Sequence, residues 1–125
     1  KERGGIIQFD IESAELDENA RQLVDEVFAD QRGASYFFIV ARASPDGSTE
    51  FNQELSEKRA KAVMSRLQEK FQDPDLKREV GLLWLGEEFA QLDKEFCSWR
   101  RSRSGDCSSA DLNRSAFIAW IDCTL

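Results

Sequence analysis

The hydrophobic positions of this chain fall into short β-rich runs and longer periodic stretches. Four runs contain mostly β-branched, aromatic and aliphatic residues and have the length of strands. They span Gly5–Phe9, Tyr36–Val40, Val80–Leu85 and Ala116–Ile121. Because Tyr36–Val40 is aromatic or aliphatic at every position, we expect a strand that is buried on both faces or nearly so.

Two stretches between these runs have the period of an amphipathic helix. The first is predicted to begin near Asp17, whose carboxylate can accept from the free amides of the first turn, and to stop at Gly33. Its apolar stripe comprises Ala20, Leu23, Val24, Val27 and Phe28. The second helix is predicted over Ser48–Phe71, between a Pro45-Asp46-Gly47 turn and Asp73-Pro74.

The order of these elements predicts an α+β domain. It reads β-α-β-α-β-β, an arrangement in which two main helices pack on one mixed sheet as a two-layer sandwich. We expect residues 1–125 to form a single domain, because 125 residues with 41% hydrophobic content suit one core. Residues 93–112 are predicted to be a loop-rich insertion before the last strand.

The charge of the chain narrows its classes of partner. A formal net charge of −7 disfavours nucleic acid and anionic membrane surfaces, because both require a basic face on the protein. The one basic run, Arg100–Arg103, is better explained as a solvated loop than as an anion-binding patch. No apolar run approaches the length of a membrane span, and a lipidated or membrane-anchored segment upstream of Lys1 stays open.

The residue types argue against catalysis and metal binding. The chain has no histidine, so its three cysteines lack both the partner of a cysteine nucleophile and a usual zinc ligand. Glu87 and Glu88 form a candidate acid–base pair, but adjacent carboxylates at a strand exit are expected to be solvated. We therefore expect no enzyme activity, no metal and no cofactor.

Arg59 is the charged residue that the helical pattern singles out. It lies between Leu55 and Val63 on one i, i+4 row, so its side chain starts on or beside the buried stripe. From the residues alone, it can extend to solvent, pair with a nearby carboxylate or bind an anionic ligand, and the first two explanations are favoured.

The segment from Ala41 to Ala60, ARASPDGSTEFNQELSEKRA, resembles the OmpA-like domain family. The family reads GHTD-x-x-G-x-x-x-Y-N-x-x-L-S-x-x-R-A at this point, and the helical half of the pattern is matched. The matching positions are Gly47, Phe51 in place of tyrosine, Asn52, Leu55, Ser56, Arg59 and Ala60. Ile7–Leu16 and Leu112–Arg114 are similar to the opening and closing motifs of the family.

The resemblance implies the same α+β fold and a peptidoglycan-binding site on it. The family arginine at the position of Arg59 binds the carboxylate of diaminopimelate in the peptidoglycan stem peptide, a geometry that suits a guanidinium. Asn52 and Leu55 correspond to residues of the same pocket, and Arg114 falls on an asparagine-arginine motif near it. Without the family, Asn52 reads as a surface amide and Leu55 as a core residue.

The end of the second strand departs from the family pattern. Gly-His-Thr-Asp is replaced by Ala41-Arg42-Ala43-Ser44, so Ser44 stands where the family has the aspartate that pairs with the ligand's ammonium group. Losing a charged partner from an enclosed site weakens binding by about 1.5–3 kcal/mol. Asp46 is a candidate substitute carboxylate, although its position before Gly47 favours a role in the turn. Arg42 adds a positive group, which disfavours an ammonium.

The cysteines bear on the compartment of the protein. Cys97 and Cys107 bracket the basic insertion, and so short a loop closes easily where thiols are oxidised. Some OmpA-like domains have a disulfide in this loop, so the resemblance implies a Cys97–Cys107 bond. On the sequence, three reduced thiols stay an alternative, and with the bond formed Cys123 is left over.

Two functions follow from the resemblance. The first is a periplasmic peptidoglycan-binding module that anchors a lipoprotein, an outer-membrane protein or an envelope complex to the cell wall of a Gram-negative bacterium. The second is a degenerate OmpA-like domain that serves as a structural or protein-interaction part of a secretion machine or stator. A carboxylate brought into the pocket supports the first, and a pocket filled by Arg42 or by Phe89–Phe96 supports the second.

Overall fold

A computed structural model describes residues 4–30, 36–45, 48–72, 80–87, 91–105 and 107–121 of the chain. The elements in chain order are β1 (Gly4–Gln8), α1 (Glu18–Asp30), β2 (Tyr36–Ala41), α2 (Thr49–Phe71), β3 (Val80–Trp84), η1 (Lys94–Ser98), α4 (Ser109–Asn113) and β4 (Ser115–Ile121). The predicted stop at Gly33, the Asp73-Pro74 break and Cys123 lie outside the described residues.

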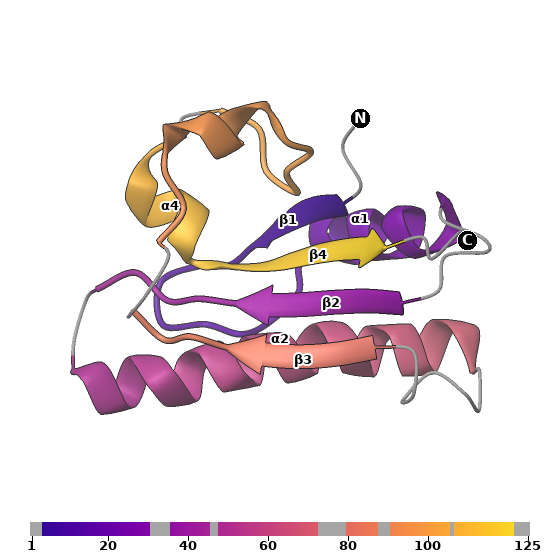
Figure 1. Ribbon diagram of the computed structural model, residues 1–125, viewed down its shortest axis with the longest axis horizontal. Coiled ribbons are helices and arrows are strands. Elements are labelled where there is room, and N and C mark those ends of the chain that lie inside the picture. The colour runs from indigo at the N-terminus through magenta and orange to yellow at the C-terminus, as the bar shows by residue number, and fades with distance from the viewer. Residues whose placement is uncertain are drawn as a thin grey trace.

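The strands form one mixed sheet in the order β1-β4-β2-β3 (Figure 1). The last strand, β4, is antiparallel to both of its neighbours, β1 and β2. β2 and β3 are parallel, with Ile39 opposite Leu82, and α2 makes the crossover between them. The predicted α+β class, with two main helices on a mixed sheet, is confirmed.

The long helices begin where the sequence provides hydrogen-bonding caps. Asp17 Oδ1 accepts from the amide of Ala20 at 2.8 Å, and Ser48 Oγ accepts from the amide of Phe51 at 3.1 Å. Gln72, with a left-handed φ of 48°, ends α2. None of the helices in the described segments has the length and apolar character needed to cross a membrane.

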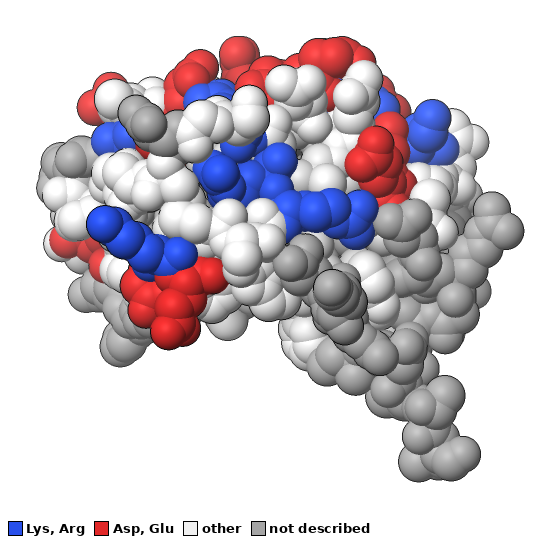
Figure 2. Space-filling view, turned by 90° about the horizontal axis from the view of Figure 1, so that it is seen from above, with Lys and Arg blue, Asp and Glu red and all other residues white. Residues whose placement is uncertain are grey.

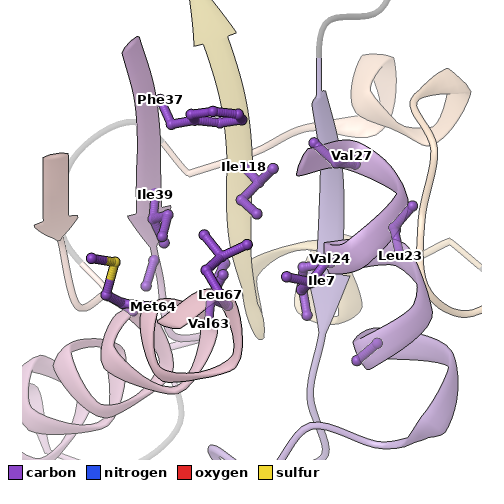
Figure 3. Close-up of a cluster of buried hydrophobic side chains, with 14 of the residues drawn as sticks. Ile7, Leu23, Val24, Val27, Phe37, Ile39, Val63, Met64, Leu67 and Ile118 are labelled. Carbon is purple, nitrogen blue, oxygen red and sulfur yellow. The ribbon is translucent and has the colours of Figure 1, made fainter. Parts of the chain in front are cut away.

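The main core lies between one face of the sheet and the two long helices (Figure 3). The side chains with no exposed surface include Ile7, Val24, Val27, Ile39, Val63, Leu67 and Ile118. Burying an aliphatic side chain of this size contributes about 1.5–3 kcal/mol. This packing holds the buried face of α2 against the sheet.

The prediction that β2 is buried on both faces is wrong. Phe37, Ile39 and Ala41 are buried under the helices, whereas Phe38, on the opposite face, is 38% exposed. The reason is that both long helices pack on the same face of the sheet. Leu83 of β3 lies beside Val40 on the uncovered face and is 53% exposed.

Residues of the segments 91–105 and 107–114 pack on the opposite face, at the β1 end of the sheet, and form a second, smaller cluster with Ile6 and Phe117. Its buried members are Ile6, Leu92 and Leu112, and Phe96, Trp99 and Phe117 pack against them. The ring of Trp99 lies 5.0 Å from that of Phe117, so Trp99 is a packing residue of this cluster. The implied disulfide is present between Cys97 and Cys107, with the Cα atoms 6.0 Å apart.

Candidate ligand pocket around Arg59

Arg59 is a charged side chain with no exposed surface, near the middle of α2. Three main-chain carbonyls accept hydrogen bonds from its guanidinium. Nε donates to Ser13 at 2.8 Å, Nη1 to Arg42 at 3.0 Å and Nη2 to Asp10 at 3.0 Å. The side chain therefore does not extend to solvent, and it joins α2 to the loop after β1 and to the end of β2.

The dipoles of main-chain carbonyls compensate the charge of Arg59. Among the residues that the structure describes, no carboxylate forms an ion pair with it. Burial, and then the charge of Arg114, lower the pKa of Arg59 to about 10. The guanidinium lies 5.2 Å from the centre of the Phe9 ring, a further weak compensation. Since a pKa of about 10 is well above 7, Arg59 is cationic at neutral pH.

A small pocket of about 10 Å³ opens beside this guanidinium. Five of the six residues proposed for ligand binding line it together with Ile11 and Glu12; they are Ser44, Asn52, Leu55, Arg59 and Arg114. The sixth, Asp46, lies outside the described residues. A volume of this size holds about one water molecule, so a larger ligand must displace side chains at the rim.

The fold explains why residues far apart in sequence meet here. Leu55 lies one turn and Asn52 two turns before Arg59 on the buried face of α2. Ser44 follows β2, and Arg114 precedes β4. Because β2 and β4 are antiparallel neighbours, the last residues of β2 and the first residues of β4 lie at the same end of the sheet. Ser44 and Arg114 are therefore close to this part of α2.

Ser44 is buried, with 6% of its surface exposed, and presents no charge to the pocket. Arg42 does not line the pocket; its contribution is the carbonyl that accepts from Arg59. Burial lowers the pKa of the Arg42 guanidinium. Phe96 packs against Trp99 and Phe117, while Phe89 lies outside the described residues. In the described part of the chain, neither predicted filler occupies the pocket.

Two carboxylates near the pocket were not among the predicted ligand-binding residues. Glu12 lines the pocket from the loop after β1 and has a left-handed φ of 57°. Glu87 Oε1 accepts from Asn52 Nδ2 at 2.6 Å, so Glu87 is not merely a solvated residue of the strand exit. Glu88 lies outside the described residues.

The sequence offers a reason to expect Glu87 near the pocket and offers none for Glu12. Glu87 follows β3, and the carboxyl ends of the parallel strands β2 and β3 share an edge of the sheet. Glu12 is placed by the path of an irregular loop, which has no periodicity to read. Within the described segments, no group of Cys, Asp and Glu side chains is placed to hold a metal ion.

A wider groove of about 320 Å³ continues from the pocket and shares Glu12 and Leu55 with it. Its wall includes Phe51, which is 41% exposed, and three further charged residues, Glu15, Glu54 and Lys58. The pocket thus presents two guanidiniums, and the groove beside it presents mostly carboxylates. This arrangement suits a ligand that carries a carboxylate and an ammonium group.

Comparison with known proteins identifies the family. A profile of the OmpA family matches residues 8–88, well over half of the chain. No curated protein matches the chain.

Several solved structures have the same fold. The peptidoglycan-associated lipoprotein from Burkholderia pseudomallei has a TM-score of 0.65 and 20% identity, over 92% of this chain and 88% of that chain. The C-terminal domain of Helicobacter pylori MotB has a TM-score of 0.66 and 12% identity, over 92% and 82%. The cell wall anchor of the T6SS from Pseudomonas aeruginosa has a TM-score of 0.61 and 15% identity, over 91% and 74%. At these identities the likeness establishes the fold alone.

Proposed function

The chain belongs to the OmpA family, and from that premise we propose that it is a non-catalytic peptidoglycan-binding module of the Gram-negative periplasm. It anchors a lipoprotein, an outer-membrane protein or an envelope complex to the cell wall. Its ligand is the stem peptide of peptidoglycan, with a carboxylate of diaminopimelate bound at Arg59. The printed names of two compared structures, a peptidoglycan-associated lipoprotein and a cell wall anchor, support this role.

The observation that carries the proposal is the buried charge of Arg59. A guanidinium removed from water is costly without an anion, and hydrogen bonds to carbonyls compensate only part of that cost. Arg114 places a second positive charge at the same pocket in a chain whose net charge is −7. A carboxylate bound at Arg59 would compensate its buried charge through charge-assisted hydrogen bonds, and Arg114, which is itself paired with Asp111 at 3.4 Å, adds to the positive potential there.

The remaining pocket residues have separate roles in this proposal. Asn52, held by Glu87, and Leu55 form the wall against which the ligand packs. Ser44 offers a hydroxyl, and Glu12 supplies the carboxylate for the ligand's ammonium group in place of the family aspartate. On binding, the side chain of Ile11 moves aside and that of Glu12 turns toward the ammonium group, since the pocket has a volume of only about 10 Å³.

The proposal is tested by calorimetric titration with two soluble muropeptides that differ at one residue. One carries meso-diaminopimelate and the other carries lysine, which has the same ammonium group but lacks the second carboxylate. We expect saturable binding of the first and at least tenfold weaker binding of the second, equivalent to about 1.4 kcal/mol. Equal affinity for both would contradict the assignment of Arg59, and no binding of either at millimolar concentration would contradict wall binding.

The second candidate function, a structural or protein-interaction subunit, is favoured by one observation. Phe38 and Leu83 expose apolar surface on the sheet face that the helices leave uncovered. Ser44→Asp separates the two functions, because it restores the charge that the family has at this position. A parent chain that binds no muropeptide, together with a Ser44→Asp variant that does, would assign the chain to this second class.

A further inference from the structure

The loop closed by Cys97–Cys107 is docked on the free edge of β1. Ile6 donates its amide to the carbonyl of Arg100 at 2.8 Å and accepts from the amide of Ser102 at 3.0 Å. The amide of Gln8 donates to Ser102 Oγ at 2.8 Å. The loop is therefore held in register with the strand that leads directly into residues 9–17. On the face seen from above in Figure 2, Lys and Arg side chains gather near the centre, with Asp and Glu on either side.

Arg103, on this loop, reaches both ends of the connection from β1 to α1. Its Nη1 lies 2.8 Å from Asp10 Oδ1, and its Nη2 lies 3.2 Å from Asp17 Oδ2. Asp17 is also the cap of α1, through its other carboxylate oxygen. One guanidinium thus fixes the start of the connection to the start of the helix.

Asp10 connects Arg103 to the ligand pocket. Its side chain accepts from Arg103, and its main-chain carbonyl accepts from Arg59 Nη2 at 3.0 Å. The same connection provides the Ser13 carbonyl that binds Arg59 Nε, and it provides Ile11 and Glu12 at the pocket wall. The position of residues 10–13 therefore determines both the orientation of Arg59 and the shape of the rim.

The contacts of Arg103 are more easily explained by loop position than by fold stability. Asp10 is 76% exposed and Arg103 is 32% exposed. Ion pairs this open to solvent contribute little to the free energy of unfolding. Their geometric effect is larger, because the disulfide and the hydrogen bonds of the loop to β1 already fix the main chain of Arg103, whose own amide donates to Gln8 Oε1 at 3.2 Å.

We propose that Arg103 is a positioning residue for the Arg59 pocket, and that it makes ligand affinity depend on the Cys97–Cys107 bond. The inference rests on the proposed function for its ligand. Breaking the Cys97–Cys107 bond or substituting Arg103 releases residues 10–13. The carbonyls of Asp10 and Ser13 then no longer hold Arg59 in the orientation that binds the ligand's carboxylate.

The binding test is a double-mutant cycle, measured by calorimetry with the diaminopimelate muropeptide. We expect binding to weaken about tenfold in Arg103→Gln, and about tenfold in the double variant Cys97→Ser with Cys107→Ser. The variant that combines all three changes is expected to bind no more weakly than either of these. Lys94→Gln removes the same charge from an exposed position of η1 and is expected to leave affinity within twofold. Parent-like affinity in Arg103→Gln, or additive losses in the cycle, would overturn the proposal.

A ligand-independent measurement keeps this inference separate from the wall-binding proposal. The amide of Ser13 donates to the carbonyl of Asp10 at 3.1 Å, inside the connection that Arg103 holds. Hydrogen exchange at Ser13 is expected to accelerate at least tenfold in Arg103→Gln and in the cysteine variant, and to stay unchanged in Lys94→Gln. Unchanged exchange at Ser13 in Arg103→Gln would refute the positioning role even if the parent chain binds no muropeptide.

Discussion

Arg59 and Arg66 lie two turns apart on the same face of α2, yet they differ in exposure and in the kind of hydrogen-bond acceptor that they contact. Arg66 forms a two-point ion pair with Asp25 of α1, with its Nε 3.1 Å and its Nη2 2.7 Å from the two carboxylate oxygens. Its side chain is 22% exposed. Arg59 is fully buried and is bound by main-chain carbonyls. One region of the helix thus holds a neutralised arginine, and the other holds a buried charge.

The pKa shifts of the two residues follow from this difference. The hydrogen bonds that Arg66 donates to Asp25 raise the pKa of Arg66, whereas burial lowers the pKa of Arg59 to about 10. The protein therefore stabilises the charged form of Arg66 and disfavours the charged form of Arg59. An arginine of the first kind holds two helices together, and one of the second kind is suited to an anionic ligand.

The largest effect is expected for Arg59→Ala. Three carbonyls lose their donor, at about 1 kcal/mol each, so the free energy of unfolding falls by about 3 kcal/mol. Muropeptide binding is expected to be lost as well. Urea unfolding and calorimetry measure the two quantities, and Arg59→Lys, which keeps the charge, should lose less stability than Arg59→Ala. Parent-like stability of Arg59→Ala would mean that the carbonyl contacts contribute nothing.

A smaller effect is expected for Arg66→Ala, the matched control on the same helix. Losing the partly exposed pair with Asp25 is expected to lower the free energy of unfolding by less than Arg59→Ala does, because solvent screens such a pair. Affinity for the muropeptide should stay within twofold of the parent, because Arg66 does not line the pocket beside Arg59. A tenfold loss of affinity would show that the two regions of α2 are coupled.

The smallest effect is expected from pH near neutrality. Arg59 is protonated on both sides of pH 7, since its pKa is lowered only to about 10. Affinity should therefore change less than twofold between about pH 6.5 and 8.5, and should fall as pH rises through 10 and the guanidinium loses its proton. The Arg66–Asp25 pair should persist across that range because its arginine pKa is raised. Calorimetric titrations at three pH values test this, and a steep change near pH 7 would point to another titrating group.

The sequence was a good guide wherever structure depends on near neighbours. Asp17 and Ser48 cap their helices as local hydrogen-bonding rules require. The helical rows placed Arg59 beside the buried stripe, which is where it lies. The sequence was a poor guide to β2, because an apolar run does not reveal whether a layer covers one face of the sheet or both.

The candidate site was only partly predictable for the same reason. The family motif pointed to Asn52, Leu55 and Arg59 on one helix face, and these residues do line one pocket. Nothing in the sequence indicated that Asp10 and Ser13 would supply carbonyls to Arg59, or that Arg103 would hold the same loop. Such contacts join residues of different elements and depend on the final path of irregular loops.

By itself, the sequence determined the order of the four strands and the two long helices, the acidic net charge and the absence of histidine chemistry, but it did not reveal η1 and α4 inside the predicted loop insertion. Only the tertiary structure decided the strand order β1-β4-β2-β3, which brings Ser44 and Arg114 to Arg59. It also decided that Arg66 meets a carboxylate and Arg59 meets carbonyls. The physical reason is that propensity and capping act between close neighbours in the chain, whereas desolvation and charge pairing depend on which distant segments pack together.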